Sequence, residues 1–341
     1  MISVAYHDDL KEVQDSAPLA ALLDAPAAAA PFDRLAWWQG LARDCGLAPL
    51  LAVARDGDDA AVLPLQRTGA GLQALANWYS FRVRPVVTPG ADSRALLTRL
   101  AADLARRDGR LTLAPVPDEH GEARLLAEAF RAAGWFVDVC PCDTNHVLAV
   151  GGRSYAEYLA GRPGPLRTTL KRKARKVVVS LFHHFDDAAW DAYEAIYAQS
   201  WKPEEGSPAF LRRFAEAEGA AGRLRMAVAY AAIDGIVQPV AAQFWTVEGG
   251  TAYIHKLAHV EAAKPLSPGT TLSAALFEQV IDRDGVDFVD FGTGDDGYKR
   301  DWMEFQRPRY RLSMLRPGNP RHWPRIARLV LRRLAGGREH G

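Results

Sequence analysis

Three apolar runs separated by glycine turns, in the second half of the chain, constrain the possible fold most strongly. The runs cover 224–230, 237–245 and 251–257, and the turns between them are Asp234-Gly235 and Gly249-Gly250. Short apolar runs joined by such turns are typical of neighbouring antiparallel strands. The sequence therefore predicts a three-stranded meander.

Helical and apolar segments alternate after these runs. A helix is expected from about 268 to 283, then a strand at 286–291 and a short helix around 298–302. A final strand at 310–315 is expected to close the domain. Strands and helices in this order indicate an α+β, mixed α/β architecture.

The first half of the chain carries weaker signals of the same kind. Apolar runs within 50–65 flank an Asp56-Gly57 turn, which predicts a hairpin. The alanine-rich stretch 20–30 is consistent with a helix and a loop, and 32–41 with an amphipathic helix. This half is mixed α/β as well, and it contains no cluster of residues that points to chemistry.

The length of 341 residues favours two domains, because single domains usually contain about 150 residues. Turn-forming residues gather near Gly151-Gly152 and between 162 and 165, where a boundary is expected. We therefore expect domains at 1–155 and 156–318, followed by a tail at 319–341.

The charge balance points to no general electrostatic partner, since 42 basic residues nearly cancel 41 acidic ones. We therefore predict no nucleic-acid partner. Cys45, Cys140 and Cys142 lack the spacing of a redox or zinc site, and we interpret them as reduced thiols. Neither a secretory signal nor an apolar run of roughly 20 residues is visible. A cytoplasmic location is expected.

A helix start suited to anion binding follows the meander. Ser267 is a favourable N-cap, Pro268 suits the first helical position, and Gly269 allows close approach. The backbone amides of Gly269, Thr270 and Thr271 are then expected to point at an anion, with Lys264 adding a charge. The same residues would also be present in a well-capped helix that binds nothing.

A basic segment lies at the start of the second half of the chain. Its members fall on a short predicted helix before an apolar strand at 177–182: Arg167, Lys171, Arg172, Lys173, Arg175 and Lys176. Either a contact with phosphate or with an anionic surface, or a simple solvated helix face, explains this segment.

Two motifs carry a resemblance to a known family. The segment Asp290–Trp302 reads D-F-G-T-G-D-D-G-Y-K-R-D-W, and Lys264-x-x-Ser267-x-Gly269 precedes it. The first resembles the D-F-x-x-G-D-x-x-Y-K-x-x-W signature of the CelD/BcsL and FemAB-like branch of GNAT acyltransferases. The second resembles the superfamily's pyrophosphate loop, Gln/Arg-x-x-Gly-x-Gly/Ala, from which lysine and serine depart at two positions.

The resemblance, which covers about 162–317, implies two tandem GNAT-like domains, each a mixed, largely antiparallel sheet flanked by helices. The N-terminal domain would be a degenerate copy. Acyl-CoA or acetyl-CoA would be the co-substrate, bound by residues at the strand end and helix start: Leu257, Lys264, Ser267, Gly269, Thr270 and Thr271. An amine would attack the thioester directly, without an acyl-enzyme.

Four residues are candidates for the chemistry. His255 lies at the end of the central strand and is a candidate base, since the ordinary pKa of histidine is near 6.5; a packed or solvated histidine is the alternative. Asp295 is a second candidate base. Tyr298 could protonate the departing thiolate, and Lys299 could stabilise the oxyanion or hold an anionic acceptor. His255 and His259 do not lie on a helix, so no metal site is predicted.

The tail alternates arginines with apolar residues at helical spacing from about 321 to 334. Such a basic amphipathic helix suits the surface of an anionic membrane, and equally a helix docked on the protein. If it contacts the inner face of a membrane, the acceptor is expected to be a lipid, such as a sphingoid base acylated to ceramide.

Other acceptors and roles stay open. One alternative is an acetyltransferase acting on a sugar, an exopolysaccharide or a small amine. An aminoacyl-tRNA donor is disfavoured because the long helical hairpin typical of FemAB-like transferases is missing. A non-catalytic GNAT-fold binding protein is the remaining alternative. The sequence predicts no oligomeric state.

Overall fold

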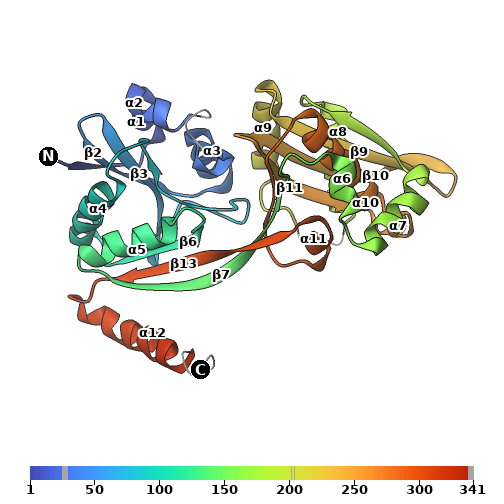
Figure 1. Ribbon diagram of the computed structural model, residues 1–341. Helices are drawn as coiled ribbons and strands as arrows, with labels where there is room; N and C mark the ends of the chain where they lie inside the picture. The colour runs from blue at the N-terminus through green and yellow to red at the C-terminus, as the bar shows by residue number, and fades with distance from the viewer. Residues whose placement is uncertain (25–29, 201, 203, 337–341) are drawn as a thin grey trace. The chain divides into compact units, whose positions relative to one another are not determined.

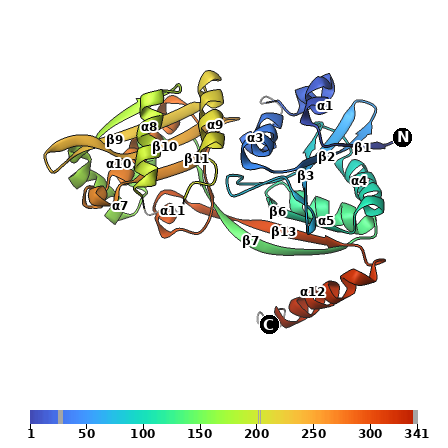
Figure 2. The same ribbon diagram turned by 180° about the vertical axis from the view of Figure 1, so that it is seen from behind.

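The computed structural model describes residues 1–24, 30–200, 202 and 204–336. The chain divides into two compact units (Figures 1 and 2): unit 1 contains Met1–Asp143 and Pro308–Gly341, and unit 2 contains Thr144–Arg307. Each unit is described by itself below.

The sheet of unit 1 has the strand order β1-β2-β3-β4-β6-β13. The strands are β1 (Ser3–His7), β2 (Pro49–Asp56), β3 (Asp59–Thr68), β4 (Gly71–Ala74), β6 (Arg110–Val116) and β13 (Phe305–Leu315), and the short β5 (Val86–Val87) pairs with β3. The β4–β6 pair is parallel, and the other pairs on this path are antiparallel. The hairpin predicted at 50–65 is confirmed as β2–β3, with Gly57 in the left-handed region at the turn.

Two amphipathic helices cover one face of this sheet and build the core of unit 1. They are α4 (Ser93–Arg107) and α5 (Glu122–Ala132), which lie against each other. Their apolar residues, such as Leu100 and Phe130, pack with Leu111 and Leu113 of β6. Because side chains of a strand alternate between its faces, the residues between these leucines lie on the other face of the sheet.

The N-terminal helices follow the predicted pattern in part. They are α1 (Leu10–Asp15), α2 (Ala17–Leu22), the 3₁₀ turn η1 (Pro31–Asp33) and α3 (Leu35–Cys45). Residues 25–29 of the alanine-rich stretch lie outside the described residues. The helix predicted at 32–41 begins as η1 and continues as α3.

The sheet of unit 2 has the order β7-β12-β11-β10-β9-β8. The strands are β7 (Phe136–Ala149), whose last part belongs to this unit, β8 (Val178–Phe182), β9 (Leu224–Ile233), β10 (Ile236–Glu248), β11 (Thr251–His259) and β12 (Phe288–Thr293). The predicted meander is confirmed, since β9, β10 and β11 pair antiparallel in sequence order. The β11–β12 pair is parallel and β12–β7 antiparallel, so the sheet is mixed, as expected.

Helices cover both faces of this sheet. They are α6 (Tyr155–Ala160), α7 (Gly164–Lys173) with η2 (Ala174–Lys176), α8 (Asp187–Ala198), α9 (Pro208–Ala220), η3 (Glu261–Leu266), α10 (Pro268–Glu278) with the π-helical turn η4 (Gln279–Arg283), and α11 (Gly297–Trp302). Phe244 contacts Trp190 of α8, whereas its neighbour Trp245 contacts Phe277 of α10. Since neighbouring strand residues face opposite sides, α8 and α10 lie on opposite faces.

The final strand departs from the prediction. We expected 310–315 to close the C-terminal domain, but β13 pairs with β6 of unit 1 over Tyr310–Leu315. The units therefore divide at 143/144 and 307/308 rather than at 155/156 and 318/319, and the tail belongs to unit 1. The tail is helical, as predicted: η5 (Pro320–His322) leads into α12 (Trp323–Gly336).

No helix in the described part of the chain has both the length and the apolar character needed to cross a bilayer.

Candidate functional site

Two neighbouring strands of unit 2 diverge next to a helix start. β11 and β12 pair in parallel from Thr251 to Tyr253, and β11 then continues to His259. The 3₁₀ helix η3 follows β11 and leads directly into α10. Parallel strands that separate in this way leave backbone amides and carbonyls of one strand edge for other partners.

A cavity of about 270 Å³ lies beside this opening. Six residues that the sequence analysis selected line it: Leu257, Lys264, Ser267, Gly269, Thr270 and Tyr298. They come from β11, the η3–α10 junction and α11, so the fold brings together positions more than 40 residues apart in the chain. His259 and Asp301 add two titratable groups to the lining.

The start of α10 has the expected position but not the expected cap. Ser267 is the N-cap and Pro268 the first helical residue, as predicted, but Ser267 has φ 52° and its side chain does not cap the helix. Instead, its Oγ accepts a hydrogen bond from Nζ of Lys173 at 3.0 Å. The first amides of a helix lack partners within the helix, so Gly269 and Thr270 present theirs beside this lysine.

The amide of Thr271 was predicted to point at an anion, but it already has a hydrogen-bond acceptor within the helix. Its N–H donates to the carbonyl of Ser267 at 3.3 Å, which is the first hydrogen bond of the helix, and its side chain is buried. The amides of this turn that have no partner within the helix are therefore those of Gly269 and Thr270, because the amide four residues after the N-cap donates to the N-cap carbonyl.

Positive charge surrounds this helix start. Lys173 ends α7 and belongs to the basic segment, for which the sequence left a phosphate contact and a solvated face open; the structure places its amino group at the cavity's Ser267. Lys264 is exposed and pairs with Glu261 at 3.6 Å. The proximity of Lys173 depends on the packing of α7 against α10, which no local pattern encodes.

Gly269 leaves space that a side chain would occupy. A Cβ atom at this position would lie 3.6 Å from Cδ1 of Leu257 and 3.8 Å from Cδ2 of His259. These are ordinary van der Waals separations, so the backbone would tolerate alanine while the cavity would lose volume.

Tyr298 is the candidate acid of the cavity. Its ring packs edge to face on Phe291, with 5.6 Å between ring centroids, and the side chain is partly exposed. Burial, and after it the charge of Asp296, raises the pKa of Tyr298 to about 12. The phenol is therefore protonated at neutral pH and able to donate a proton.

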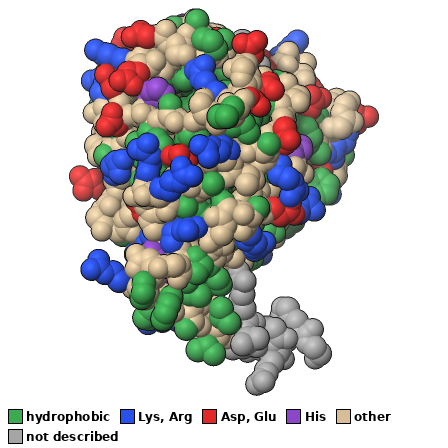
Figure 3. All heavy atoms as spheres, turned by 90° about the vertical axis from the view of Figure 1, so that its left-hand side faces the viewer, with side chains coloured by type: hydrophobic (Ala, Val, Ile, Leu, Met, Phe, Trp, Pro, Cys, Tyr) green, Lys and Arg blue, Asp and Glu red, His purple; other side chains and the backbone are tan. Residues whose placement is uncertain are grey.

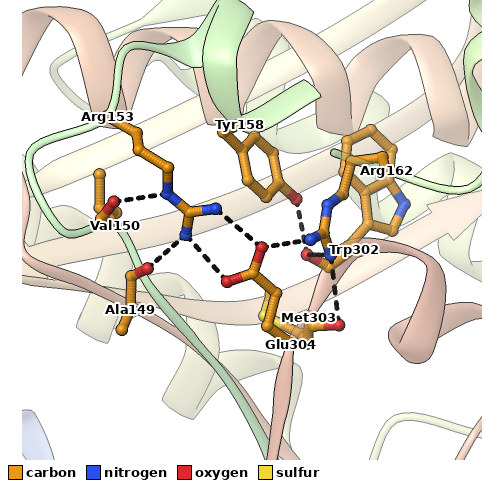
Figure 4. A network of polar contacts seen from close by, with 8 residues as sticks. All are labelled: Ala149, Val150, Arg153, Tyr158, Arg162, Trp302, Met303 and Glu304. Carbon is orange, nitrogen blue, oxygen red and sulfur yellow. Dashed lines mark hydrogen bonds and ion pairs between the residues drawn. The ribbon is translucent and has the colours of Figure 1, made fainter. Parts of the chain in front are cut away.

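A polar network fixes the end of α11, which carries Tyr298 (Figure 4). The hydroxyl of Tyr158 donates to the carbonyl of Trp302 at 2.6 Å, and Glu304 forms ion pairs with Arg153 and Arg162. The two arginines lower the pKa of Glu304, with Arg153 as the larger cause. The ring of Trp302 also stacks on Phe277 of α10, with 4.7 Å between centroids. These contacts tie α11 to α6 and α10.

Lys299 and Asp295 are not among the residues that line this cavity. Nζ of the buried Lys299 donates to the carbonyls of Thr293 and Gly294, and so holds the loop before α11. Asp295 binds Arg300 and lies 3.0 Å from Nε2 of His146. Arg300 is the main reason why the pKa of Asp295 is lowered, which makes this carboxylate a weaker base.

His255 lies on the face of the sheet covered by α8 and α9. Phe244 pairs with Lys256 and Trp245 with Ile254, so His255 is the extra residue of a β-bulge. Its ring stacks on Phe244 at 5.5 Å and packs against Phe214 at 4.9 Å between centroids. Its Nε2 lies 2.8 Å from Oγ1 of Thr246. His255 is therefore part of a packed aromatic cluster and does not line the cavity at α10.

A second cavity of about 510 Å³ lies on the α8/α9 face. Aromatic rings, carboxylates and a lysine line it, among them Trp190, Tyr193, Tyr197, Glu194, Glu205 and Lys202. Nζ of Lys256 contacts Oε1 of Glu205 at 2.9 Å, and burial together with Lys256 lowers the pKa of Lys202 to about 8. None of these residues was predicted from the sequence. The one available signal was the helical spacing of the three rings on α8.

Comparison with known proteins agrees with this arrangement. Residues 165–300 match the family model of the acetyltransferase (GNAT) domain. Among solved structures, FemX superposes with a TM-score of 0.61 at 10% identity, covering 91% of this chain and 96% of that chain. A tandem GNAT protein from the clavulanic acid biosynthesis pathway superposes with a TM-score of 0.53 at 15% identity, covering 92% of this chain and 98% of that chain. L-PGS from Bacillus licheniformis superposes with a TM-score of 0.51 at 14% identity, covering 82% of this chain and 86% of that chain.

At these identities the structural likenesses establish the fold. None of the curated proteins matches the chain. The family match covers the diverging strands, the start of α10 and most of α11 described above. Residues 165–300 therefore match the GNAT acetyltransferase domain, and the chain as a whole has a fold similar to those of FemX and of the tandem GNAT protein.

Proposed function

We propose that the chain is an N-acyltransferase that moves an acyl group from acyl-CoA to an amine by direct attack. One observation carries the proposal: the start of α10 opens into a cavity beside diverging strands, with Lys173 hydrogen-bonded to its N-cap. A helix N-terminus with an adjacent cation is a favourable site for a diphosphate.

The donor would be held by its diphosphate. The amides of Gly269 and Thr270 would donate to the phosphate oxygens, and Lys173 and Lys264 would supply the compensating charges. The acyl end would then lie along the free edge of β11, past Tyr253, where backbone amides are available to the thioester oxygen.

In the chemical step, the nitrogen lone pair of a neutral amine forms a bond to the thioester carbonyl carbon. The resulting oxyanion collapses, the carbon–sulfur bond breaks, and CoA thiolate leaves. Tyr298, which lines the cavity, would protonate the thiolate as it leaves. The amine loses its proton to a base, and His255 is the candidate on the face where the second cavity offers room for an acceptor.

We assign Lys299 a positioning role. Its amino group donates to two loop carbonyls, which supports a function in shaping the start of α11 rather than in contacting the oxyanion. Asp295 would act in the same loop through Arg300 and His146.

The experiment measures donor binding by isothermal titration with acetyl-CoA and with a long-chain acyl-CoA. Lys173→Ala should weaken binding about five- to tenfold, which corresponds to about 1–1.4 kcal/mol for a lost charged contact. Lys171→Ala, an exposed lysine on the same helix, should bind like the wild type. If the wild type binds neither thioester, the chain is a non-catalytic GNAT-fold protein and the proposal is wrong.

A second candidate function is acyl transfer to a lipid acceptor, and the surface of α12 supports it. Trp323 and Leu331 are 59% and 65% exposed, and Arg321, Arg328 and Arg332 are exposed alongside them. Apolar and basic side chains on one helix suit peripheral contact with an anionic membrane. A sphingoid base, acylated to ceramide, would be such an acceptor. Faster acylation of a sphingoid base in vesicles than of a soluble amine or amino sugar supports it; the reverse order favours the small-acceptor alternative.

A further inference from the structure

A cavity of about 370 Å³ lies in unit 1, apart from the GNAT-domain residues. Strands β3, β4, β6 and β13 and helix α12 each contribute to its lining. The polar side chains of this lining are those of Gln66, Gln73, Arg110, Thr112, Arg311 and Arg325.

The alternation of strand residues explains why polar side chains gather here. In β6, Leu111 and Leu113 are buried in the core with α4 and α5, so Arg110 and Thr112 lie on the opposite face. In β13, Arg311 alternates with the buried Leu312 in the same way. The cavity therefore sits on the face of the sheet that α4 and α5 do not cover.

Three guanidinium groups line this cavity, and none of the described residues that line it carries a carboxylate. Among the residues that the structure describes, Arg110, Arg311 and Arg325 form no side-chain hydrogen bond or ion pair. Burial lowers the pKa of Arg325, and the charges of Arg110 and Arg328 lower it further. Clustered like charges repel one another, so an anion in the cavity would stabilise this arrangement.

Neutral donors complete the lining. Gln73 and Thr112 are register partners across the β4–β6 pair, and they place an amide and a hydroxyl side by side. Gln66 adds no further donor, since its amide nitrogen already donates to the carbonyls of Ala74 at 2.8 Å and Ala76 at 3.2 Å. Guanidinium, amide and hydroxyl donors that converge on one space are the groups that recognise phosphate oxygens.

We propose that this cavity binds the phosphate group of an organic phosphate. Three separate guanidinium groups match a phosphate ligand, with its several oxygens and its charge, better than they match a ligand with a single carboxylate. A volume of about 370 Å³ exceeds the space that a phosphate ion alone would fill, so the cavity has room for the organic part of such a ligand. The proposal does not depend on acyl transfer in unit 2.

Two sources supply this chemistry: a soluble phosphate ester and a phospholipid headgroup. The headgroup is a candidate because Arg325 comes from α12, which also exposes Trp323 and Leu331. Figure 3 shows hydrophobic side chains gathered on this C-terminal helix in the lower part of the view, with Lys and Arg side chains on the surface above it.

The test compares the full-length wild type with Arg110→Gln/Arg311→Gln and with Arg67→Gln, an exposed arginine on β3 next to Gln66. One arm titrates glycerol 3-phosphate, with chloride at matched ionic strength as the reference. The other arm measures co-sedimentation with phosphatidylglycerol vesicles, with phosphatidylcholine vesicles as the reference.

Binding in either arm that falls about tenfold or more in the double variant, and stays within about twofold in Arg67→Gln, supports the site. The arm that responds identifies the source. Binding of the wild type in neither arm overturns the proposal, as does equal binding by the wild type and the double variant. Unchanged acyl-CoA affinity in the double variant would show that the chain is folded and that the two sites are separate.

Discussion

The hydrogen bond from Lys173 to Ser267 is the residue-scale feature on which donor binding depends most. A lysine is costly to hold beside a helix start unless an anion is near, because the N-terminus of a helix carries a partial positive charge. Here the ammonium group lies 3.0 Å from the N-cap hydroxyl, next to the amides of Gly269 and Thr270. A bound diphosphate would compensate both positive charges at once.

Tyr298→Phe tests the proposed proton donor. The substitution removes the hydroxyl and keeps the ring that packs on Phe291, so the fold should persist. We expect kcat to fall about 100-fold or more, because a positioned general acid contributes on that order, while the Kd for acyl-CoA changes little. Because the pKa of Tyr298 is about 12, the wild type should keep this proton through mildly alkaline pH. Wild-type kcat in the variant would remove Tyr298 from the chemistry.

Local signals identified the helix start and Tyr298, but not the groups that chain folding brings to the site. The N-cap, the first helical proline and the glycine are adjacent in sequence, so the position of Gly269 and its neighbours was predictable. Lys173, Lys202 and Glu205 come from other segments, and their contacts depend on the packing of helices around the sheet. The amide of Thr271 was misjudged because the count of unpaired amides depends on which carbonyl accepts the first helical bond.

At the scale of elements, the first turn and the later turns of α10 have different roles. Its N-terminal turn faces the cavity, whereas Leu272, Leu276 and Phe277 are buried in the core of unit 2. The buried residues fix the axis of the helix against β9 and β10. The start of the helix is therefore held in place by burial of its later turns.

Gly269→Ala should separate these two roles. The added methyl group would contact Leu257 and His259 at ordinary distances, so stability should change little, but it would occupy the space beside the amides. We expect the Kd for acyl-CoA to rise about tenfold, or about 1.4 kcal/mol. Gly297→Ala is the matched control, since a Cβ atom at this helix start meets nothing within 4 Å. Equal affinities of both variants would argue against donor binding at α10.

At the scale of the whole molecule, ion pairs join segments that are far apart in the chain. Glu304 binds Arg153, 151 positions away, and Arg162, 142 positions away. Arg162 is buried, so a neutral partner would leave its charge poorly compensated. The stability of unit 2 therefore depends on contacts between residues that flank its first and last helices.

Glu304→Gln should lower the free energy of unfolding by about 2 kcal/mol or more, measured by denaturant titration at pH 7. Glu128→Gln, which removes the exposed pair with Arg94, should cost less than about 0.5 kcal/mol. The folded-state pKa of Glu304 is lowered, so its contribution is present above the unfolded value of about 4.3 and is lost as pH falls through the folded value. A difference between wild type and Glu304→Gln that does not shrink toward pH 3 would contradict this account.

The partner of the last strand was beyond local sequence reasoning. The alternation in 310–315 predicts a strand, but it does not specify which of several apolar strands pairs with it. The answer, β6, lies almost 200 residues earlier, and the two arginine-bearing strands together form a wall of the cavity in unit 1. The meander, in contrast, pairs strands that are neighbours in sequence, and it was predicted correctly.

The pairing of β13 with β6 also bears on how the protein is made. A ribosome delivers Arg110–Val116 long before Tyr310–Leu315, so the growing chain carries one side of β6 uncovered while most of the polypeptide is still being synthesised. An uncovered strand edge readily pairs with other chains. The nascent chain therefore completes its first-made unit last, and one edge of β6 stays without its native partner until then.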